Sequence, residues 1–297
     1  MTISRREAVM AGGAALLLPA ATRGSDPRAK FIAGVRKLEA GLGRGARIGV
    51  QLIDPVSGRN ASWRATERFP MCSTFKLLLA GQMLWRVDHG QEKLARELAV
   101  PATTLPNSPT TRAHAGGRLS IADLCKAAVT QSDNTAANLL LGTVGGPAGL
   151  TAFLRTTGDR VTRLDRTEPS LNEATPGDPR DTTTPGAMLE TLRRLTYGAV
   201  LSAASRQQLV AWLRANTTGG ERLAKGLPAG WAIGDKTGTG THMSNNDVAL
   251  IWPAGRATER PIFATVLLTG GAGDDALARN PVHAKIGAMI GELLGAG

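Results

Sequence analysis

The chain has 297 residues, a formal net charge of +11 and 42% hydrophobic residues, a length sufficient for one large domain or two closely packed lobes. The basic residues are scattered without forming a run, and only 4% of the residues are aromatic, so a base-stacking platform for nucleic acid has little to be built from. We interpret the charge as a solvated basic surface that can attract a small anionic substrate, and we expect no nucleic acid partner.

The N-terminal segment is typical of an export signal. Arg5 and Arg6 precede a mildly apolar run, Ala8–Ala21, which ends in small residues. The paired arginines favour the twin-arginine route. We therefore expect a signal peptide over residues 1–27 and a mature protein that is exported to the periplasm or secreted. The alternative is a frayed N-terminal helix. No cysteine follows the run, so we expect no membrane anchor.

Taken in chain order, the predicted elements place strands near both ends of the chain and helices in the middle. A helix over residues 28–42 precedes a hairpin, with strands around 48–52 and 60–64. Further helices are predicted at 73–86, 121–130, 135–141, 149–156, 185–195 and 205–215. Strands at 231–237, 247–252 and 262–268 and a helix at 282–294 complete the chain. Residues 163–185 contain too many turn formers for a helix, and a loop of this length is usually functional.

This order of elements predicts an α+β fold. The simplest arrangement is one antiparallel sheet built from both termini with flanking helices, plus an all-α lobe. We expect the mature domain to cover residues 28–297. Its α/β lobe would comprise residues 28–65 and 216–297, and its helical lobe residues 66–215. A cleft between two lobes is a natural place for a ligand.

A serine and a lysine, Ser73 and Lys76, are spaced so that they share one face of a helix. At a helix N-terminus the dipole favours the negative charge that develops on a serine nucleophile. A lysine whose pKa is lowered can activate such a serine. The alternative for this motif alone is an N-cap serine with a surface lysine.

Two further motifs follow in order along the chain. Ser132-Asp133-Asn134 lies between two predicted helices, where it could also be only a turn and helix cap. Lys236-Thr237-Gly238 ends a predicted strand, where the lysine could also be only a charged sheet edge. Together the three motifs resemble the set found in class A β-lactamases and penicillin-binding proteins.

The long loop distinguishes between these relatives. The segment Arg163–Thr183 is similar to the omega loop of class A β-lactamases, with Glu168 and Asn172 at the positions that hold the hydrolytic water. Arg166 and Asp181 match the ion pair that closes this loop. The resemblance covers roughly residues 30–295. It implies a β-lactamase/transpeptidase-like fold that hydrolyses the β-lactam amide of penicillins and cephalosporins, with carbapenems left open. Ser73 would form the acyl-enzyme, and water activated by Glu168 would hydrolyse it.

The resemblance also implies roles for the other motif residues. Lys76 would assist Ser73, and Ser132 would relay a proton to the β-lactam nitrogen. Asn134 would bind the acylamino carbonyl of the substrate, whereas Asp133 would be structural. The backbone N–H groups of Ser73 and Thr239 would form the oxyanion hole.

The substrate carboxylate would be held at the end of the last motif. Lys236, Thr237 and Thr239 resemble the carboxylate anchor, and Gly238 would let substrate lie close to the strand edge. Many relatives carry an arginine where this chain has Asn245. Here Arg222 resembles the arginine that a subgroup uses instead.

Cys72 and Cys125 each lack the partner found in some relatives, because Gly240 and Ala80 occupy those places. We therefore expect two free thiols. The four histidines are scattered and lack the spacing of a zinc site, so neither a metal nor another cofactor is implied. The expected partners are small-molecule β-lactams, and the protein is expected to be a monomer.

Two other functions share the serine and lysine motifs. A penicillin-binding DD-peptidase would act on a peptide, and a non-catalytic sensor domain would bind β-lactams covalently without turnover. The omega-loop match argues against the first. Sensors usually belong to membrane receptors, and no apolar stretch of this chain is long enough to span a membrane.

Overall fold

The computed structural model describes residues 26–257 and 260–295. Its main sheet has five antiparallel strands in the order β2-β1-β9-β8-β7. The N-terminal part of the chain supplies β1 (Arg47–Ile53) and β2 (Asn60–Trp63), and the C-terminal part supplies β7 (Ala232–Thr239), β8 (Asn245–Trp252) and β9 (Ile262–Thr269). Because β1 pairs with β9, both ends of the chain build one sheet, and the predicted α+β fold class is confirmed.

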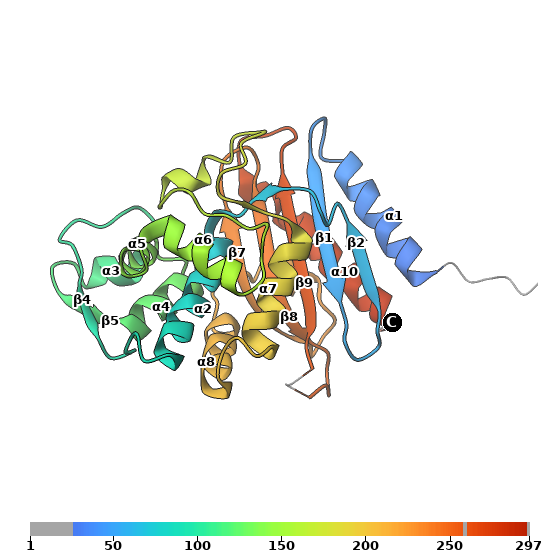
Figure 1. Cartoon of the computed structure of the whole chain (residues 1–297). Helices are drawn as coiled ribbons and strands as arrows, with labels where there is room; N and C mark the ends of the chain where they lie inside the picture. The colour runs from blue at the N-terminus through green and yellow to red at the C-terminus, as the bar shows by residue number, and fades with distance from the viewer. Residues whose placement is uncertain (1–25, 258–259, 296–297) are drawn as a thin grey trace, which may run out of the picture.

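Both faces of the sheet are buried, as the alternation along β8 shows. Val248 and Leu250 belong to a core shared with the helices of the middle segment, whereas Ala249 and Ile251 belong to a second core. Successive side chains of a strand point to opposite faces, so the C-terminal part of β8, from Val248 to Trp252, is apolar on both faces. The second core is closed by α1 (Pro27–Ala40) and α10 (Asn280–Leu294), which cover one face of the sheet (Figure 1).

The other face of the sheet carries α7 (Pro185–Tyr197) and α8 (Ala203–Arg214) (Figure 1). At the end of α7 the ring of Tyr197 meets Phe263 of β9 edge to face, with centroids 5.6 Å apart. Both helices lie in the range predicted for the helical lobe, so the two lobes are less separate than the sequence suggests. The remaining long helices are α2 (Phe75–Asp88), α4 (Ile121–Thr130), α5 (Asn134–Thr143) and α6 (Gly146–Thr156).

The predicted helix over 73–86 begins later than expected. Residues Cys72–Thr74 form a 3-10 turn, and α2 starts at Phe75. Cys72, just before the predicted start, has a backbone φ of 47° in the left-handed region, so the chain enters the helix through a tight turn. Ser73 is therefore placed in the tight turn that leads into α2.

Several short elements were not predicted, because they contain too few residues to show a hydrophobic period. These elements are β3 (Phe69–Pro70), β4 (Glu97–Ala99), β5 (Arg118–Ser120), β6 (Thr182–Thr183), α3 (Pro109–Ala113) and α9 (Leu223–Gly226). The predicted loop 163–185 includes β6, which pairs with β3, and a 3-10 turn at Ser170–Glu173. The loop is therefore fixed to the body of the protein at its C-terminal end.

The predicted leader, residues 1–27, lies outside the described residues except for its last two. The side chain of Asp26 accepts the N–H of Arg28 at 3.0 Å and caps α1, whose first residue is Pro27. Over the described part of the chain, no single helix is long and apolar enough to span a membrane. Only α5 and α6 taken together, with a bend of 71° between them, have the length and composition of a membrane span.

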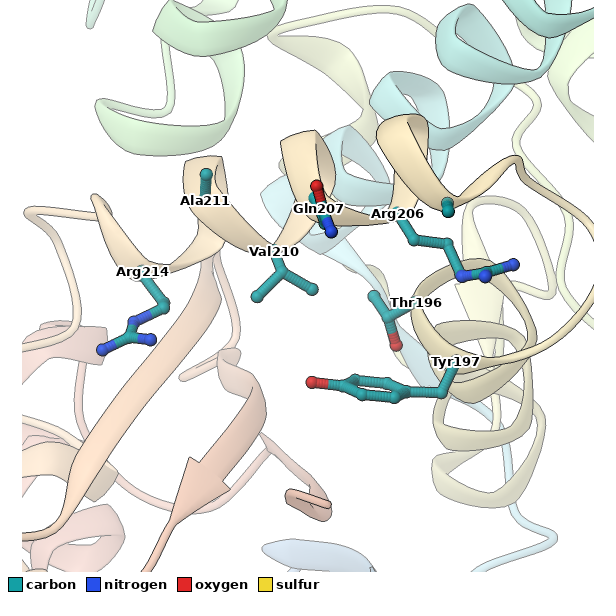
Figure 2. A pocket seen from close by; sticks show the side chains of 8 residues that line it. Thr196, Tyr197, Arg206, Gln207, Val210, Ala211 and Arg214 are labelled. Atoms are coloured by element: carbon teal, nitrogen blue, oxygen red, sulfur yellow. The ribbon is translucent and has the colours of Figure 1, made fainter. Parts of the chain in front are cut away.

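One hollow of about 470 Å³ lies between the end of α7 and one side of α8. Figure 2 shows Val210 of α8 and Tyr197 of α7 on its walls, with Arg206 and Arg214 toward its two ends. None of the residues predicted to carry chemistry lines this hollow. It is therefore separate from the candidate active site.

Candidate active site

The buried centre of the site joins a serine, a lysine and a glutamate. The Lys76 ammonium lies 2.8 Å from Ser73 Oγ and 2.8 Å from Glu168 Oε1, and Ser73 Oγ lies 3.0 Å from the same carboxylate oxygen. The side chains of Lys76 and Glu168 are fully buried, whereas Ser73 is 8% exposed. Burial lowers the pKa of Lys76, although the Glu168 carboxylate opposes this shift. A serine proton can therefore pass to either neighbour.

Ser132 connects this centre to the sheet. Its hydroxyl oxygen lies 3.3 Å from Lys76 Nζ and 3.1 Å from Lys236 Nζ, so two lysines flank one hydroxyl. Burial, followed by the charge of Lys76, lowers the pKa of Lys236 well below its usual value. The fold thus unites the first, second and third sequence motifs around Ser132.

Asn134 and its neighbour Asp133 make different contacts. Asn134 faces the site: its Oδ1 accepts from Lys76 Nζ at 2.6 Å, and its Nδ2 donates to the carbonyl of Pro106 at 2.9 Å. Because an amide nitrogen has two hydrogens, a second donor remains on Asn134. Asp133 instead accepts from Thr111 and caps α5 through the N–H of Ala136.

Glu168 is held in place by two asparagines. Asn172 Nδ2 donates to Glu168 Oε2 at 2.5 Å, while Asn172 Oδ1 is buried without a hydrogen-bond partner among the described residues. Asn138 of α5 accepts the backbone N–H of Glu168 at 3.0 Å and donates to its carbonyl at 2.9 Å. Asn138 was not predicted from the sequence. Its spacing of four residues from Asn134, which puts both on one helix face, could have revealed it.

The neck of the loop is closed by the predicted ion pair. Arg166 Nε lies 2.6 Å from Asp181 Oδ2, and the other oxygen of Asp181 accepts the backbone N–H groups of Asp165 and Arg166. Asp181 is 1% exposed, so little solvent screens the pair. The predicted contact between Arg166 and Asp181 is confirmed, and it fixes the segment that carries Glu168.

Arg222 lies behind strand β7 and is 3% exposed. Its guanidinium donates to Thr239 Oγ1 at 2.6 Å and to the carbonyls of Gly238 at 3.0 Å and Asn246 at 2.5 Å. A fourth bond, from Nε to Asn280 Oδ1, measures 3.2 Å. Asn280 also accepts from Asn245, the residue that stands where many relatives carry an arginine. Arg222 therefore directly contacts one member of the predicted carboxylate anchor.

Gly238 of β7 packs closely against the segment around Ser73. A Cβ added there would lie 2.7 Å from the carbonyl oxygen of Met71 and 3.2 Å from Cys72 Cβ. These atoms belong to the segment around the 3-10 turn that carries Ser73. That this glycine lets substrate lie close to the strand edge stays a prediction, and the structure adds that a side chain here would push β7 away from this turn.

Two carboxyl groups below the sheet edge were not singled out from the sequence. Burial raises the pKa of Asp235. Burial also raises the pKa of Asp247 well above its usual value, and the negative charge of Asp235 raises it further. The positive charge of Arg222 acts in the opposite direction and lowers the pKa of Asp247. Asp235 accepts from Asn216, and Asp247 accepts the N–H of Leu223. Isolated aspartates carry no sequence motif that would reveal such a pair.

The remaining anchor residues lie at the end of β7. Thr237 is buried, and its hydroxyl lies 2.5 Å from that of Thr218, whereas Thr239 is exposed. Both cysteines are free and buried. Burial raises the pKa of the Cys72 thiol to about 12, so it is not a thiolate at neutral pH. In residues 26–257 and 260–295, no group of three His, Cys, Asp or Glu side chains could hold a metal ion.

A serine at a tight turn, with a buried lysine and glutamate in contact with its hydroxyl, is typical of serine enzymes that form covalent acyl intermediates. Residues 33–294 match the model of the β-lactamase enzyme family, so the chain belongs to that family. Its similarity to named β-lactamases and to class A β-lactamase structures further identifies it as a class A serine β-lactamase, which confirms the predicted resemblance.

The chain is 49% identical over 214 residues to β-lactamase CTX-M-8 of Citrobacter amalonaticus, covering 72% of this chain and 74% of that one. It is 47% identical over 250 residues to β-lactamase L2 of Stenotrophomonas maltophilia, covering 84% and 82% of the two chains. Among solved structures, an ancestral class A β-lactamase superposes with a TM-score of 0.84 at 56% identity, covering 88% of this chain and 99% of that one.

Proposed function

We propose that the enzyme hydrolyses the β-lactam amide of penicillins and cephalosporins in two steps, through an ester on Ser73. The observation that carries this proposal is the direct contact of Ser73 Oγ with both Lys76 and Glu168. In the first step the serine proton passes to one of these bases while Oγ attacks the β-lactam carbonyl. The C–N bond of the ring then breaks, and Ser132 delivers a proton to the departing nitrogen and recovers one from Lys76, whose Nζ lies 3.3 Å from its hydroxyl.

The second step hydrolyses the ester. A water between Glu168 and the ester carbonyl gives its proton to the carboxylate, attacks the carbonyl carbon and releases Ser73 Oγ, which recovers a proton. Asn172 supports this proposal because its buried Oδ1 needs a donor, and buried polar atoms in proteins are rarely unpaired. Asn138 positions Glu168 through its backbone.

The substrate would be oriented by groups from both sides of Ser73. We assign the acylamino carbonyl to the free donor of Asn134 and the carboxylate to Lys236, Thr237 and Thr239. The backbone N–H groups of Ser73 and Thr239 would stabilise the oxyanion. The packing of Gly238 against the segment before Ser73 supports this pairing, because it places β7 beside the nucleophile.

Kinetics with benzylpenicillin and a cephalosporin test this proposal. The parent should turn over many equivalents of each, and Ser73→Ala should abolish turnover without changing the thermal melting temperature by more than a few degrees. A parent that instead forms a stable adduct without turnover would favour the penicillin-binding or sensor function. Hydrolysis of a carbapenem in the same assay decides whether the spectrum extends to that class.

We further propose that the protein is an exported monomer, with residues 28–297 as its mature domain and no membrane anchor. The support is the arginine pair and the apolar run of the leader. Substituting both Arg5 and Arg6 by Lys should keep the precursor in the cytoplasm. Normal export of this double variant would exclude the twin-arginine route.

A further inference from the structure

The fold gathers arginines that are far apart in the sequence around one hollow, distinct from the active site. Arg68, Arg155, Arg160 and Arg163 line a space of about 640 Å³, and Asp165 is the one carboxylate on its wall. Four arginines against one carboxylate leave three positive charges in excess. Part of the net positive charge of the chain, +11, is thus gathered at this hollow.

The arginines differ in how their charge is balanced. Arg163 is bidentate on Asp165, with Nε 2.9 Å from Oδ2 and Nη2 2.5 Å from Oδ1, so this pair is neutral overall. Arg68, Arg155 and Arg160 have no carboxylate partner among the described residues. The excess charge of the hollow therefore resides on these three side chains.

Two of the uncompensated arginines are held in position by neutral groups. Arg68 Nη1 donates to the carbonyl of Val161 and to Thr182 Oγ1, both at 3.0 Å. Arg155 Nη1 donates to the carbonyls of Asp159 at 2.5 Å and Thr162 at 2.8 Å. These bonds restrict the side chains but do not cancel their charge, so little conformational entropy remains to be lost when an anion binds.

We propose that this hollow binds an oligophosphate anion, whose neighbouring phosphate groups match the cluster of Arg68, Arg155 and Arg160. Guanidinium groups bind phosphate oxygens through paired, charge-assisted hydrogen bonds. The volume exceeds what one orthophosphate needs, and three uncompensated charges favour a multivalent ligand. A bound oligophosphate would join α6 to the start of the long loop and to the segment before β3.

Calorimetric titration of the parent with sodium tripolyphosphate at low ionic strength tests the proposal. We expect one site per chain, with an affinity that falls as salt is added because the charges are partly exposed. Arg160→Gln should weaken binding about tenfold, through loss of one charge-assisted contact. Arg160→Lys should retain more of the affinity. Since Arg160 has no partner among the described residues, both variants should fold normally, which their melting temperatures will show.

Arg59→Gln is the matched control, because it also removes one exposed arginine, in the turn between β1 and β2. Its affinity for tripolyphosphate should equal that of the parent. The proposal is overturned if tripolyphosphate shows no saturable binding, or if Arg59→Gln weakens binding as much as Arg160→Gln does. Binding to phosphatidylglycerol vesicles without binding of tripolyphosphate would also overturn it, in favour of a lipid headgroup.

Discussion

Replacing Arg222 by alanine should impair the enzyme through Thr239. In the structure the guanidinium donates to Thr239 Oγ1 at 2.6 Å, and Thr239 is the exposed end of the proposed carboxylate anchor. A charge-assisted hydrogen bond contributes about 1.5–3 kcal/mol. If this contact is used in the transition state, its loss corresponds to roughly a ten- to hundred-fold decrease in kcat/KM for benzylpenicillin.

Arg222 also has a structural role, which has to be separated from the kinetic one. Its other bonds go to the buried carbonyls of Gly238 and Asn246, and it is the cation that opposes the raised pKa of Asp247. Breaking buried charged contacts typically costs about 3–5 kcal/mol. The melting temperature of Arg222→Ala should therefore fall, whereas kcat/KM is to be measured well below the melting range.

A double-mutant cycle separates the two roles. Thr239→Val removes the hydroxyl that Arg222 contacts, and Thr239→Ser retains it. Because Arg222 is proposed to act through that hydroxyl, Arg222→Ala should have little further effect on kcat/KM in the Thr239→Val background. Arg118→Ala, which removes an exposed arginine paired with Glu97, should have parental kinetics. Unchanged kcat/KM in Arg222→Ala, or full additivity in the cycle, would refute the reasoning.

Three further predictions follow from contacts around the site. Asn138→Ala should slow deacylation by up to roughly thirtyfold, because two hydrogen bonds of about 1 kcal/mol each no longer fix the Glu168 backbone. Single-turnover kinetics that show slower acylation and unchanged deacylation would contradict this. Gly240→Cys should form a disulfide with Cys72, because a Cβ at position 240 would lie 2.7 Å from Cys72 Sγ. Thiol titration of the denatured, non-reduced variant should then find only the Cys125 thiol. Detection of any further thiol would show that no disulfide forms. Asp247→Asn should become more stable relative to the parent as pH rises above about 4. The reason is that the parent loses folding free energy as pH rises from the unfolded to the raised folded pKa of Asp247, whereas asparagine does not titrate. If urea unfolding at pH 5 and at pH 8 gives the same difference in stability, this prediction is wrong.

The sequence predicts the centre of the site well because its residues lie in short motifs with fixed local geometry. Ser73 and Lys76 are three positions apart, and their side chains remain neighbours although the helix starts at Phe75 and not at the serine. The ion pair of Arg166 with Asp181 is similarly local to one loop. Such contacts depend on short stretches of backbone, which the motif itself specifies.

The sequence predicts poorly what depends on contacts between distant segments. Asn138 is one of two asparagines on α5, and only the packing of the loop brings Glu168 against it. Asp247 is an ordinary strand residue until burial beside Asp235 raises its pKa. The constraint on Gly238 arises from Met71, which is far away in the chain. Only the packed structure reveals these environments.

The central claim is that Glu168 activates the water that hydrolyses the Ser73 ester, and intact-protein mass spectrometry of Glu168→Ala mixed with benzylpenicillin tests it most directly. Lys76 remains in contact with Ser73 Oγ at 2.8 Å, so the variant should still be acylated at some rate. Without the carboxylate that positions water, it should carry one adduct on Ser73 for minutes or longer, while the parent returns to its free mass once substrate is consumed. Turnover by Glu168→Ala at the parental rate, with no adduct, would contradict the account.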